Sequence, residues 1–207
     1  MKPFTQLTAV AAPLELANVD TDKIFPSRFG KMLRTPETGY GGYLFHDMRF
    51  HADGRAQSDF VLNQPGYSNA AILVAGINFG CGSSREAAVY ALVDYGITVV
   101  IAPSFGDIHY ANELQNGMLP VILAEDACQT LCRQLRAQPG TQLTIDLVAQ
   151  RVVGADGSVY RFDIDDMHKQ RLLQGLDEIG LVMQFIPQIE AFEARYRADL
   201  PWRARGR

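Results

Sequence analysis

The chain has 207 residues, which is enough for one sizeable hydrophobic core. Hydrophobic residues make up 47% and charged residues 20%, as is usual for a globular protein, and the net charge of −4 does not indicate a nucleic-acid-binding surface. No apolar run approaches the ~20 residues that span a membrane. The three cysteines cannot all pair and nothing suggests export. We therefore expect a cytoplasmic protein that binds neither nucleic acid nor membrane.

The first third of the chain is predicted to hold one strand and much irregular structure. Residues 6–12 favour a strand, and Asn18-Val19-Asp20-Thr21-Asp22 favours a turn whose short polar side chains bond their own backbone. A metal site in that turn is poorly supported, because no histidine or completing glutamate is near. Residues 29–43 have little periodicity and predict a long loop. A short helix over 43–50 and an extended piece over 60–62 follow.

The centre of the chain carries the clearest pattern. The apolar run 71–75 is too short for a helix and predicts a buried strand, whereas residues 87–95 repeat apolar side chains at helical spacing before Gly96. A second apolar strand is predicted over 97–102. Strand, glycine turn, helix and strand within ~30 residues make a βαβ unit with a right-handed crossover. We expect the chain to be organised around the turn, residues 76–86.

The second half of the chain combines further helices and strands. The predicted helices are 106–115, 125–137, 165–174 and 187–197, and the predicted strands are 119–123, 142–148, 151–153 and 159–162. Asp156-Gly157 is typical of a turn between antiparallel strands. Together the elements predict a single α/β domain over residues 1–207, with a solvated basic tail over 198–207.

The turn before the central helix is typical of an anion site. Gly80 and Gly82 let the backbone turn tightly and approach a ligand. Ser83, Ser84 and Arg85 then fall at the start of the predicted helix, where free N–H groups and the helix dipole favour an anion. A cation at this end of a helix is unfavourable, so a bound carboxylate or phosphate is expected to offset Arg85. Arginine is well suited to gripping a carboxylate with two parallel hydrogen bonds.

The residues of this turn also have other interpretations. Ser83 with Glu86 three residues later matches a capping box, which would only start the helix. The stretch lacks the third glycine of the dinucleotide fingerprint, the Gly-Lys-Ser/Thr of the P-loop and the Gly-x-Ser-x-Gly of the hydrolase elbow. The capping role and the anion site both stay open.

The cysteines and histidines do not predict a metal centre. Cys81 lies far in sequence from Cys128 and Cys132, and no Cys-x-x-Cys is present. Cys128 and Cys132 lie four residues apart on a predicted helix and are expected in the core. His109 is expected to be a partly buried polar residue rather than a catalytic one. We therefore predict no metal bound by this chain.

Five segments in order along the chain resemble the small subunits of 3-isopropylmalate dehydratase, which are similar to the swivelling domain of aconitase. They are residues 18–22, 78–86, 101–105, 116–120 and 175–181. The resemblance implies an α/β fold of the three-layer β/β/α swivelling type. It also implies a hydro-lyase of leucine biosynthesis that isomerises 2-isopropylmalate and 3-isopropylmalate by dehydration and rehydration. Activity would require a large subunit, in a heterodimer or heterotetramer, and that subunit would hold a 4Fe-4S cluster while this chain binds no cofactor.

The resemblance also implies roles for residues near the turn. Ser83 corresponds to the family's base, which removes the proton beside a carboxylate of the hydroxy-dicarboxylate substrate. Because a free serine is too weak a base, N–H groups at the helix start would have to stabilise its alkoxide. Arg85 would bind a substrate carboxylate with support from Ser84. Arg28 is the candidate for a second carboxylate-binding arginine.

The loop over residues 29–43 is the expected substrate-recognition loop. Its first part lies where the family recognises the group on the third carbon of the substrate. Met32 and Leu33 would accept an apolar substituent there, and Arg34 follows them in the same loop.

One departure from the family pattern leaves the substrate open. After Arg-Glu the family typically has His-Ala-Pro-Trp, whereas this chain has Ala87-Ala88-Val89-Tyr90. One alternative is therefore a paralogous dehydratase acting on a methylated malate, 2-methylmalate or 2,3-dimethylmalate. An alternative of another class is a non-catalytic carboxylate-binding module, and an independent serine hydrolase is a third.

Overall fold

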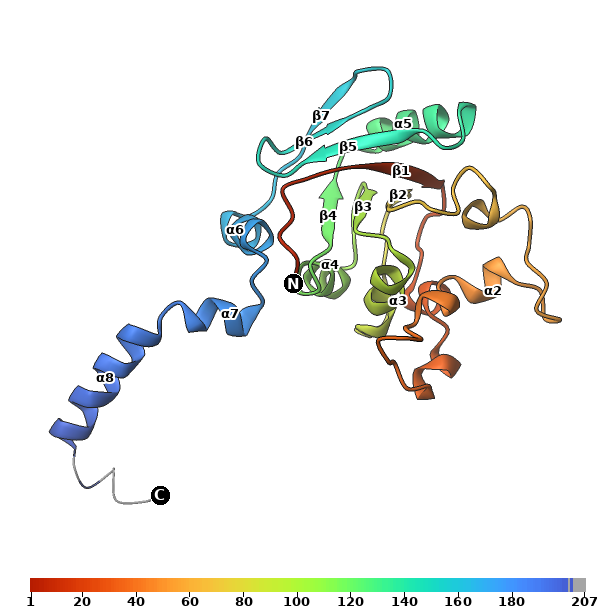
Figure 1. Cartoon of the computed structure of the whole chain (residues 1–207). Coiled ribbons are helices and arrows are strands. Elements are labelled where there is room, and N and C mark those ends of the chain that lie inside the picture. The colour runs from red at the N-terminus through yellow and green to blue at the C-terminus, as the bar shows by residue number, and fades with distance from the viewer. Residues whose placement is uncertain (201, 203–207) are drawn as a thin grey trace.

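One curled sheet of seven strands organises the computed structural model, which describes residues 1–200 and 202 (Figure 1). The strands follow the order β4-β3-β2-β1-β5-β6-β7. Their bounds are Gln6–Leu14 (β1), Ile72–Ala75 (β2), Val99–Ala102 (β3), Leu119–Ile122 (β4), Gln142–Asp146 (β5), Arg151–Val153 (β6) and Val159–Arg161 (β7). Strands β1 to β4 pair in parallel, whereas β1 with β5, β5 with β6 and β6 with β7 pair antiparallel. The predicted strands and the predicted antiparallel section are confirmed.

The helices follow most of the sequence predictions. They are Thr21–Ile24 (α1), His46–Arg49 (α2), Ala87–Tyr95 (α3), Asp107–Gln115 (α4), Glu125–Ala137 (α5), Asp166–Gln174 (α6), Glu178–Met183 (α7) and Ile186–Asp199 (α8), with 3-10 turns at Ser27–Lys31 (η1), Gly41–Tyr43 (η2) and Val61–Asn63 (η3). The extended piece expected over 60–62 was wrong, because those residues lead into and form η3. Helix α7 was not predicted. Its start is fixed by Asp177, whose side chain accepts a hydrogen bond from the Gly180 N–H at 2.7 Å.

The parallel strands are buried on both faces, which explains their continuous apolar sequence. Leu73 and Val100 face one core cluster with the buried side of α3. Val74 and Ile101 face a second cluster with α5 and the inner side of β5 and β6. Figure 1 shows α3 on one side of the parallel strands β2 to β4. Because the sheet curls, its antiparallel strands β5 to β7 lie with α5 on the other side of these parallel strands. This succession of helix, parallel strands and antiparallel strands confirms the expected three-layer β/β/α class.

The loops after β1, β2 and β3 meet at the carboxyl edge of the parallel strands. Asp20 forms an isolated bridge with Cys81, and Phe79 forms one with Phe105. In open sheets with parallel strands this edge is the usual place for ligands, because the loops there converge. The turn over residues 76–86 therefore lies at the centre of a loop cluster.

The C-terminal helices extend away from the sheet (Figure 1). Helix α8 runs to Asp199, so the tail expected over 198–207 begins inside a helix, and residues 201 and 203–207 of it lie outside the described residues. Of the helices in the described part of the chain, none combines the length and the apolar character needed to cross a membrane.

The two-sided burial of the parallel strands predicts a large cost for truncating one of their side chains. Leu73 is 0% exposed, so Leu73→Ala should lower the free energy of unfolding by roughly 2–5 kcal/mol. Leu33→Ala is the matched control, since Leu33 is 82% exposed and its truncation should change stability by less than about 0.5 kcal/mol. Urea unfolding measures both, and equal losses at the two sites would contradict this packing.

Candidate functional site

The central turn stays irregular longer than the sequence predicts. Helix α3 begins at Ala87 with Glu86 as its N-cap, and no side chain makes the capping hydrogen bond. The capping box between Ser83 and Glu86 was therefore wrong. Ser83 is exposed and Arg85 is half-buried in the segment that precedes the helix. The serine is thus presented on the surface beside a helix start rather than used to begin the helix.

Backbone hydrogen bonds fix the turn against the loop that follows β1. The Gly80 N–H donates to the Val19 carbonyl at 2.7 Å, and the Thr21 N–H donates to the Cys81 carbonyl at 3.1 Å. Gly80 has φ +71° and Gly82 has φ +91°, a region that side chains with a Cβ rarely adopt. The two glycines are needed to bring the chain around between these contacts.

Arg85 joins the turn to α1 through its side chain. Its Nη2 lies 2.6 Å from Asp22 Oδ2 and donates to Thr21 Oγ1 at 3.4 Å. Its Nε donates to Ser83 Oγ at 3.3 Å, so the two residues expected to carry the chemistry are in contact. The hydrogen bond from Arg85 lowers the pKa of Asp22. The negative partner that the position of Arg85 requires is therefore supplied by the chain itself.

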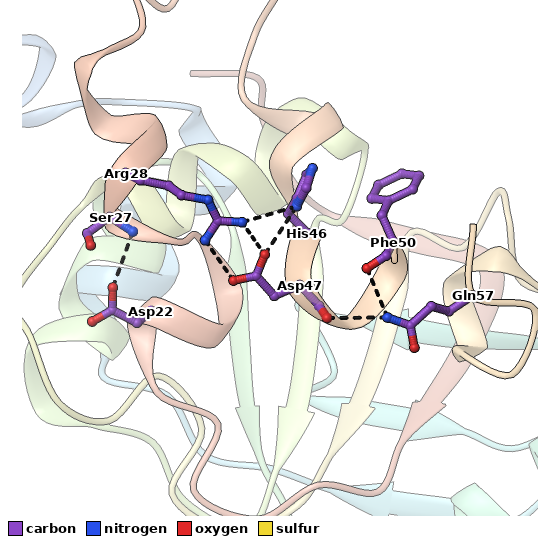
Figure 2. Close-up of polar contacts among 7 residues, drawn as sticks. All are labelled: Asp22, Ser27, Arg28, His46, Asp47, Phe50 and Gln57. Carbon is purple, nitrogen blue, oxygen red and sulfur yellow. Dashed lines mark hydrogen bonds and ion pairs between the residues drawn. The ribbon is translucent and has the colours of Figure 1, made fainter. Parts of the chain in front are cut away.

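Asp22 also reaches the segment that carries Arg28. Its Oδ1 accepts a hydrogen bond from the Ser27 N–H at 3.2 Å (Figure 2). Asp20 caps α1 by accepting from the Lys23 N–H at 2.8 Å, as expected for a turn whose acids bond their own backbone. One carboxylate thus connects Arg85 to the first residue of η1.

Arg28 is held by a carboxylate on α2. Its Nη1 donates to Asp47 Oδ2 at 2.7 Å, its Nη2 contacts Asp47 Oδ1, and His46 Nδ1 lies 3.4 Å from Nη2 (Figure 2). The hydrogen bonds from Arg28 lower the pKa of Asp47 to about 2. The guanidinium also lies over the Phe29 ring, 4.5 Å from its centroid. About half of the Arg28 side chain remains exposed, at 54%.

Arg34 anchors the loop over residues 29–43 to α3 instead of lining the recess beside that loop. Its Nε and Nη2 donate to the two Asp94 oxygens of α3 at 2.8 and 2.7 Å, and its guanidinium lies 4.2 Å from the Tyr90 ring centroid. Asp94 also accepts from the Tyr40 N–H at 2.7 Å. This single carboxylate therefore ties both halves of the loop over residues 29–43 to α3.

Met32 and Leu33 lie on the open side of the same loop. They line a recess of about 570 Å³ together with Tyr43, His46 and Phe50. The Tyr40 hydroxyl donates to the Met32 carbonyl at 2.8 Å and so fixes the backbone there. The recess shares His46 and Phe50 with the neighbouring hollow that Arg28 lines. An apolar surface and an arginine are thus side by side.

The cysteines do not gather around a common centre. Cys81 is half-buried in the turn, whereas Cys128 and Cys132 are buried in the second core, where burial raises their pKa values to about 11 and about 12. Within residues 1–200 and 202, no three His, Cys, Asp or Glu side chains are placed to share a metal ion. This donor set does not fit an iron–sulfur cluster. His109, expected to be partly buried, is only 2% exposed.

The sequence did not predict that three aspartates at the site pair with the three arginines. Asp22, Asp47 and Asp94 pair with Arg85, Arg28 and Arg34, at separations of 63, 19 and 60 residues. Only Asp22 stood in a segment that the sequence singled out, as part of a polar turn. Pairs this far apart leave no local spacing pattern, so the sequence carried no signal for the other two.

Comparison with known proteins first identifies the type of domain that this chain forms. A family model described as the aconitase C-terminal domain matches residues 1–126, and another described as LeuD_N matches residues 129–166. The solved structure of a 3-isopropylmalate dehydratase from Methanocaldococcus jannaschii aligns with a TM-score of 0.65 and 24% identity, over 91% of this chain and 99% of that one. At this identity the likeness concerns the fold. The chain is a domain of the aconitase C-terminal type.

Curated relatives then narrow the class to a family. The 3-isopropylmalate dehydratase small subunit of Afipia carboxidovorans is 49% identical over 98% of this chain and its own whole length. Those of Azorhizobium caulinodans and Brucella canis are each 48% identical with the same coverage. This chain belongs to the family of 3-isopropylmalate dehydratase small subunits.

The Arg34 anchor generates a stability prediction. Asp94→Asn should lower the free energy of unfolding by about 1–2 kcal/mol, because the variant loses the charge-assisted pair at a carboxylate that is only 16% exposed. The exposed pair of Asp53 with Arg55 offers the control, since Asp53→Asn should have almost no effect. Urea unfolding at pH 7 measures both changes.

The same variant has a predictable pH dependence. Arg34 lowers the pKa of Asp94, so the stabilisation is present above the ordinary carboxyl pKa and is lost as the pH falls through the lowered value. The stability difference between the native protein and Asp94→Asn should therefore shrink in acid. A difference that stays constant down to strongly acidic pH would refute the ionic contribution.

Proposed function

We propose that this chain is the small subunit of a heteromeric 3-isopropylmalate dehydratase that interconverts 2-isopropylmalate and 3-isopropylmalate by dehydration and rehydration. The observation that carries the proposal is the 49% identity to a protein of that name over 98% of this chain and the relative's whole length. The contact between Ser83 and Arg85 supports it, since it combines a proton acceptor with a carboxylate-binding group.

The chemistry is divided between two chains. The large subunit would hold a 4Fe-4S cluster, which supplies the Lewis acid that the leaving hydroxyl requires. This chain would bind the hydroxy-dicarboxylate and remove the proton beside its carboxylate. The exposure of Ser83 and of Arg28 supports this division, because both face outward where a partner can present substrate. The three free thiols agree with a reducing compartment such as the cytoplasm.

Ser83 would act as the base. A serine hydroxyl needs its alkoxide stabilised, and the Arg85 Nε–H donates to Ser83 Oγ at 3.3 Å. The positive charge beside the oxygen favours its deprotonated form over the neutral hydroxyl.

Arg85 would bind one substrate carboxylate. Among the described residues its contacts engage Nε and Nη2, so the donors on Nη1 remain for a ligand. Asp22 and Thr21 hold the guanidinium from the opposite side and prevent it from turning away. Ser84, exposed next to it, would add a hydroxyl donor to the same carboxylate.

Arg28 and the loop over residues 29–43 would recognise the rest of the substrate. Arg28 would bind a second carboxylate through its exposed edge while Asp47 holds the other. Met32 and Leu33 would contact the isopropyl group, since they line an open apolar recess beside the hollow that contains Arg28. Arg34 would support the loop through Asp94 rather than touch the substituent.

Reconstitution with Ser83→Ala tests the function and the base together. The native chain, mixed anaerobically with a cluster-loaded large subunit, should turn over isopropylmalate. Ser83→Ala should form the same complex and lose at least about 10²-fold in kcat, because the proton acceptor is gone. Ser58→Ala, an exposed serine in another loop, is the control. Absorbance of the unsaturated acid gives the rate, and gel filtration gives complex formation.

The outcomes of this reconstitution separate the alternatives. Full activity in Ser83→Ala would remove the base assignment while keeping the enzyme. Turnover of 2-methylmalate or 2,3-dimethylmalate in place of isopropylmalate would replace the substrate and the pathway. A stable native complex without turnover of any of them would favour a non-catalytic carboxylate-binding module.

Arg85→Lys tests carboxylate binding. Lysine keeps the positive charge but has a single nitrogen, which cannot contact Asp22, Ser83 and a substrate carboxylate together as the guanidinium can, so kcat/KM of the reconstituted enzyme should fall by about 10- to 100-fold. Arg55→Lys is the control, because the Arg55 side chain is 81% exposed and pairs only with nearby Asp53 among the described residues. Steady-state kinetics at saturating large subunit measures both. Unchanged kcat/KM in Arg85→Lys would show that the guanidinium is not needed for carboxylate binding at this position.

A further inference from the structure

Helix α4 carries a buried polar pair that the proposed chemistry does not use. His109 and Glu113 lie one turn apart, with side chains only 1% and 0% exposed. His109 Nε2 lies 3.0 Å from Glu113 Oε1. None of the four polar side-chain atoms of the pair makes a hydrogen bond within the described part of the chain, so the 3.0 Å approach is a close contact without hydrogen-bond geometry. The pair is therefore fully buried, and its two side chains meet without forming a hydrogen bond.

Such a pair is costly to bury. Burial raises the pKa of Glu113, with the neighbouring histidine opposing the shift. Removing polar groups from water is unfavourable unless their contacts compensate, and replacing a buried charged pair by apolar residues of similar volume is often neutral or stabilising. A contribution to stability therefore does not explain why His109 and Glu113 are present. Their position next to the turn over residues 76–86 does explain it.

The imidazole lies directly against the turn. A Cβ added at Gly80 would come 2.1 Å from His109 Cγ and 2.2 Å from its Cδ2, so the ring occupies the space that a side chain would fill. The Phe79 ring meets the imidazole edge-on, with centroids 5.5 Å apart. The His109 ring therefore packs directly against Gly80, and Glu113 is the polar neighbour that contacts this ring.

The other end of the turn rests on the same helix. Asn116, the C-cap of α4, donates from Nδ2 to Glu86 Oε1 at 2.8 Å. Asn116 follows His109 by seven residues, two helical turns, so both contacts come from one face of α4. Residues 80–86, with Ser83 and Arg85 in the middle, are supported at both ends by one helix.

We propose that the buried His109–Glu113 pair is a positioning element that seats Gly80 and thereby holds Ser83 and Arg85 in reactive geometry. The inference rests on the proposed function for its kinetic consequence, but not for its structural one. Glu113 contacts the imidazole and keeps it beside Gly80, and Asn116 fixes the far end of the turn. If Glu113 is lost, the ring can turn away from Gly80, which then keeps its hydrogen bond to the Val19 carbonyl but loses the packing against the imidazole.

The kinetic test compares two substitutions at Glu113 in the reconstituted enzyme. Glu113→Ala should lower kcat by about 10- to 100-fold, because small misplacements of reacting groups cost this much. KM should stay within about threefold, because Arg85 keeps its contacts with Asp22 and Thr21. Glu113→Gln keeps the length and a hydrogen-bonding group, so it should recover most of kcat. Glu125→Ala, an exposed glutamate on α5, is the control.

Amide hydrogen exchange of the full-length chain alone gives a readout independent of turnover. In Glu113→Ala, exchange should accelerate over residues 80–86 while β2 and β3 keep native protection. Unchanged exchange over 80–86 overturns the inference whether or not the enzyme turns over isopropylmalate. Equal acceleration throughout the sheet, or Glu113→Gln with no more activity than Glu113→Ala, also overturns it, since either result indicates general destabilisation.

Discussion

The loops after β1 and β2 are joined by main-chain hydrogen bonds between Gly80 and Val19 and between Thr21 and Cys81. Because these bonds use backbone atoms, they fix α1 against the turn without occupying any side chain. Asp22 is thereby placed where one oxygen reaches Arg85 and the other reaches the Ser27 amide. The contacts among the candidate site residues of the first loop and the turn depend on this junction.

The three arginines of the site each pair with an aspartate, but burial gives the pairs different consequences. Exposed ion pairs contribute little to stability, because water screens them. Asp94, 16% exposed, anchors the loop through Arg34, whereas the pair of Arg28 with Asp47 is more than half exposed on both sides. In the proposed function, an approaching carboxylate would share Arg28 with Asp47, while Arg34 holds the loop over residues 29–43 through Asp94. Solvent access, more than residue type, separates the arginine proposed to bind substrate from the one that anchors the loop.

Local patterns were sufficient for the parallel strands, for α3 and for the antiparallel section, because apolar runs and helical spacing are properties of neighbouring residues. These local patterns failed where the backbone conformation goes with a contact to a residue far away in the sequence. Ser83 and Glu86 have the spacing of a capping box, yet the chain stays irregular through Arg85, whose side chain reaches back to Asp22. The Arg85 side chain thus contacts a residue 63 positions away, and no pattern within the turn records that contact.

A surface turn that carries out the proposed chemistry would have to be rigid without being covered, because a partner subunit must approach it. Surface loops are ordinarily the more mobile parts of a domain, so order has to come from beneath. Here α4 lies under the turn, with His109 against Gly80 and Asn116 bonded to Glu86. The buried pair on α4 and the exposed Ser83 therefore lie on opposite sides of the same turn, and the pair supports the serine from beneath. The polar groups that are costly in the core hold a surface that can stay open to the large subunit.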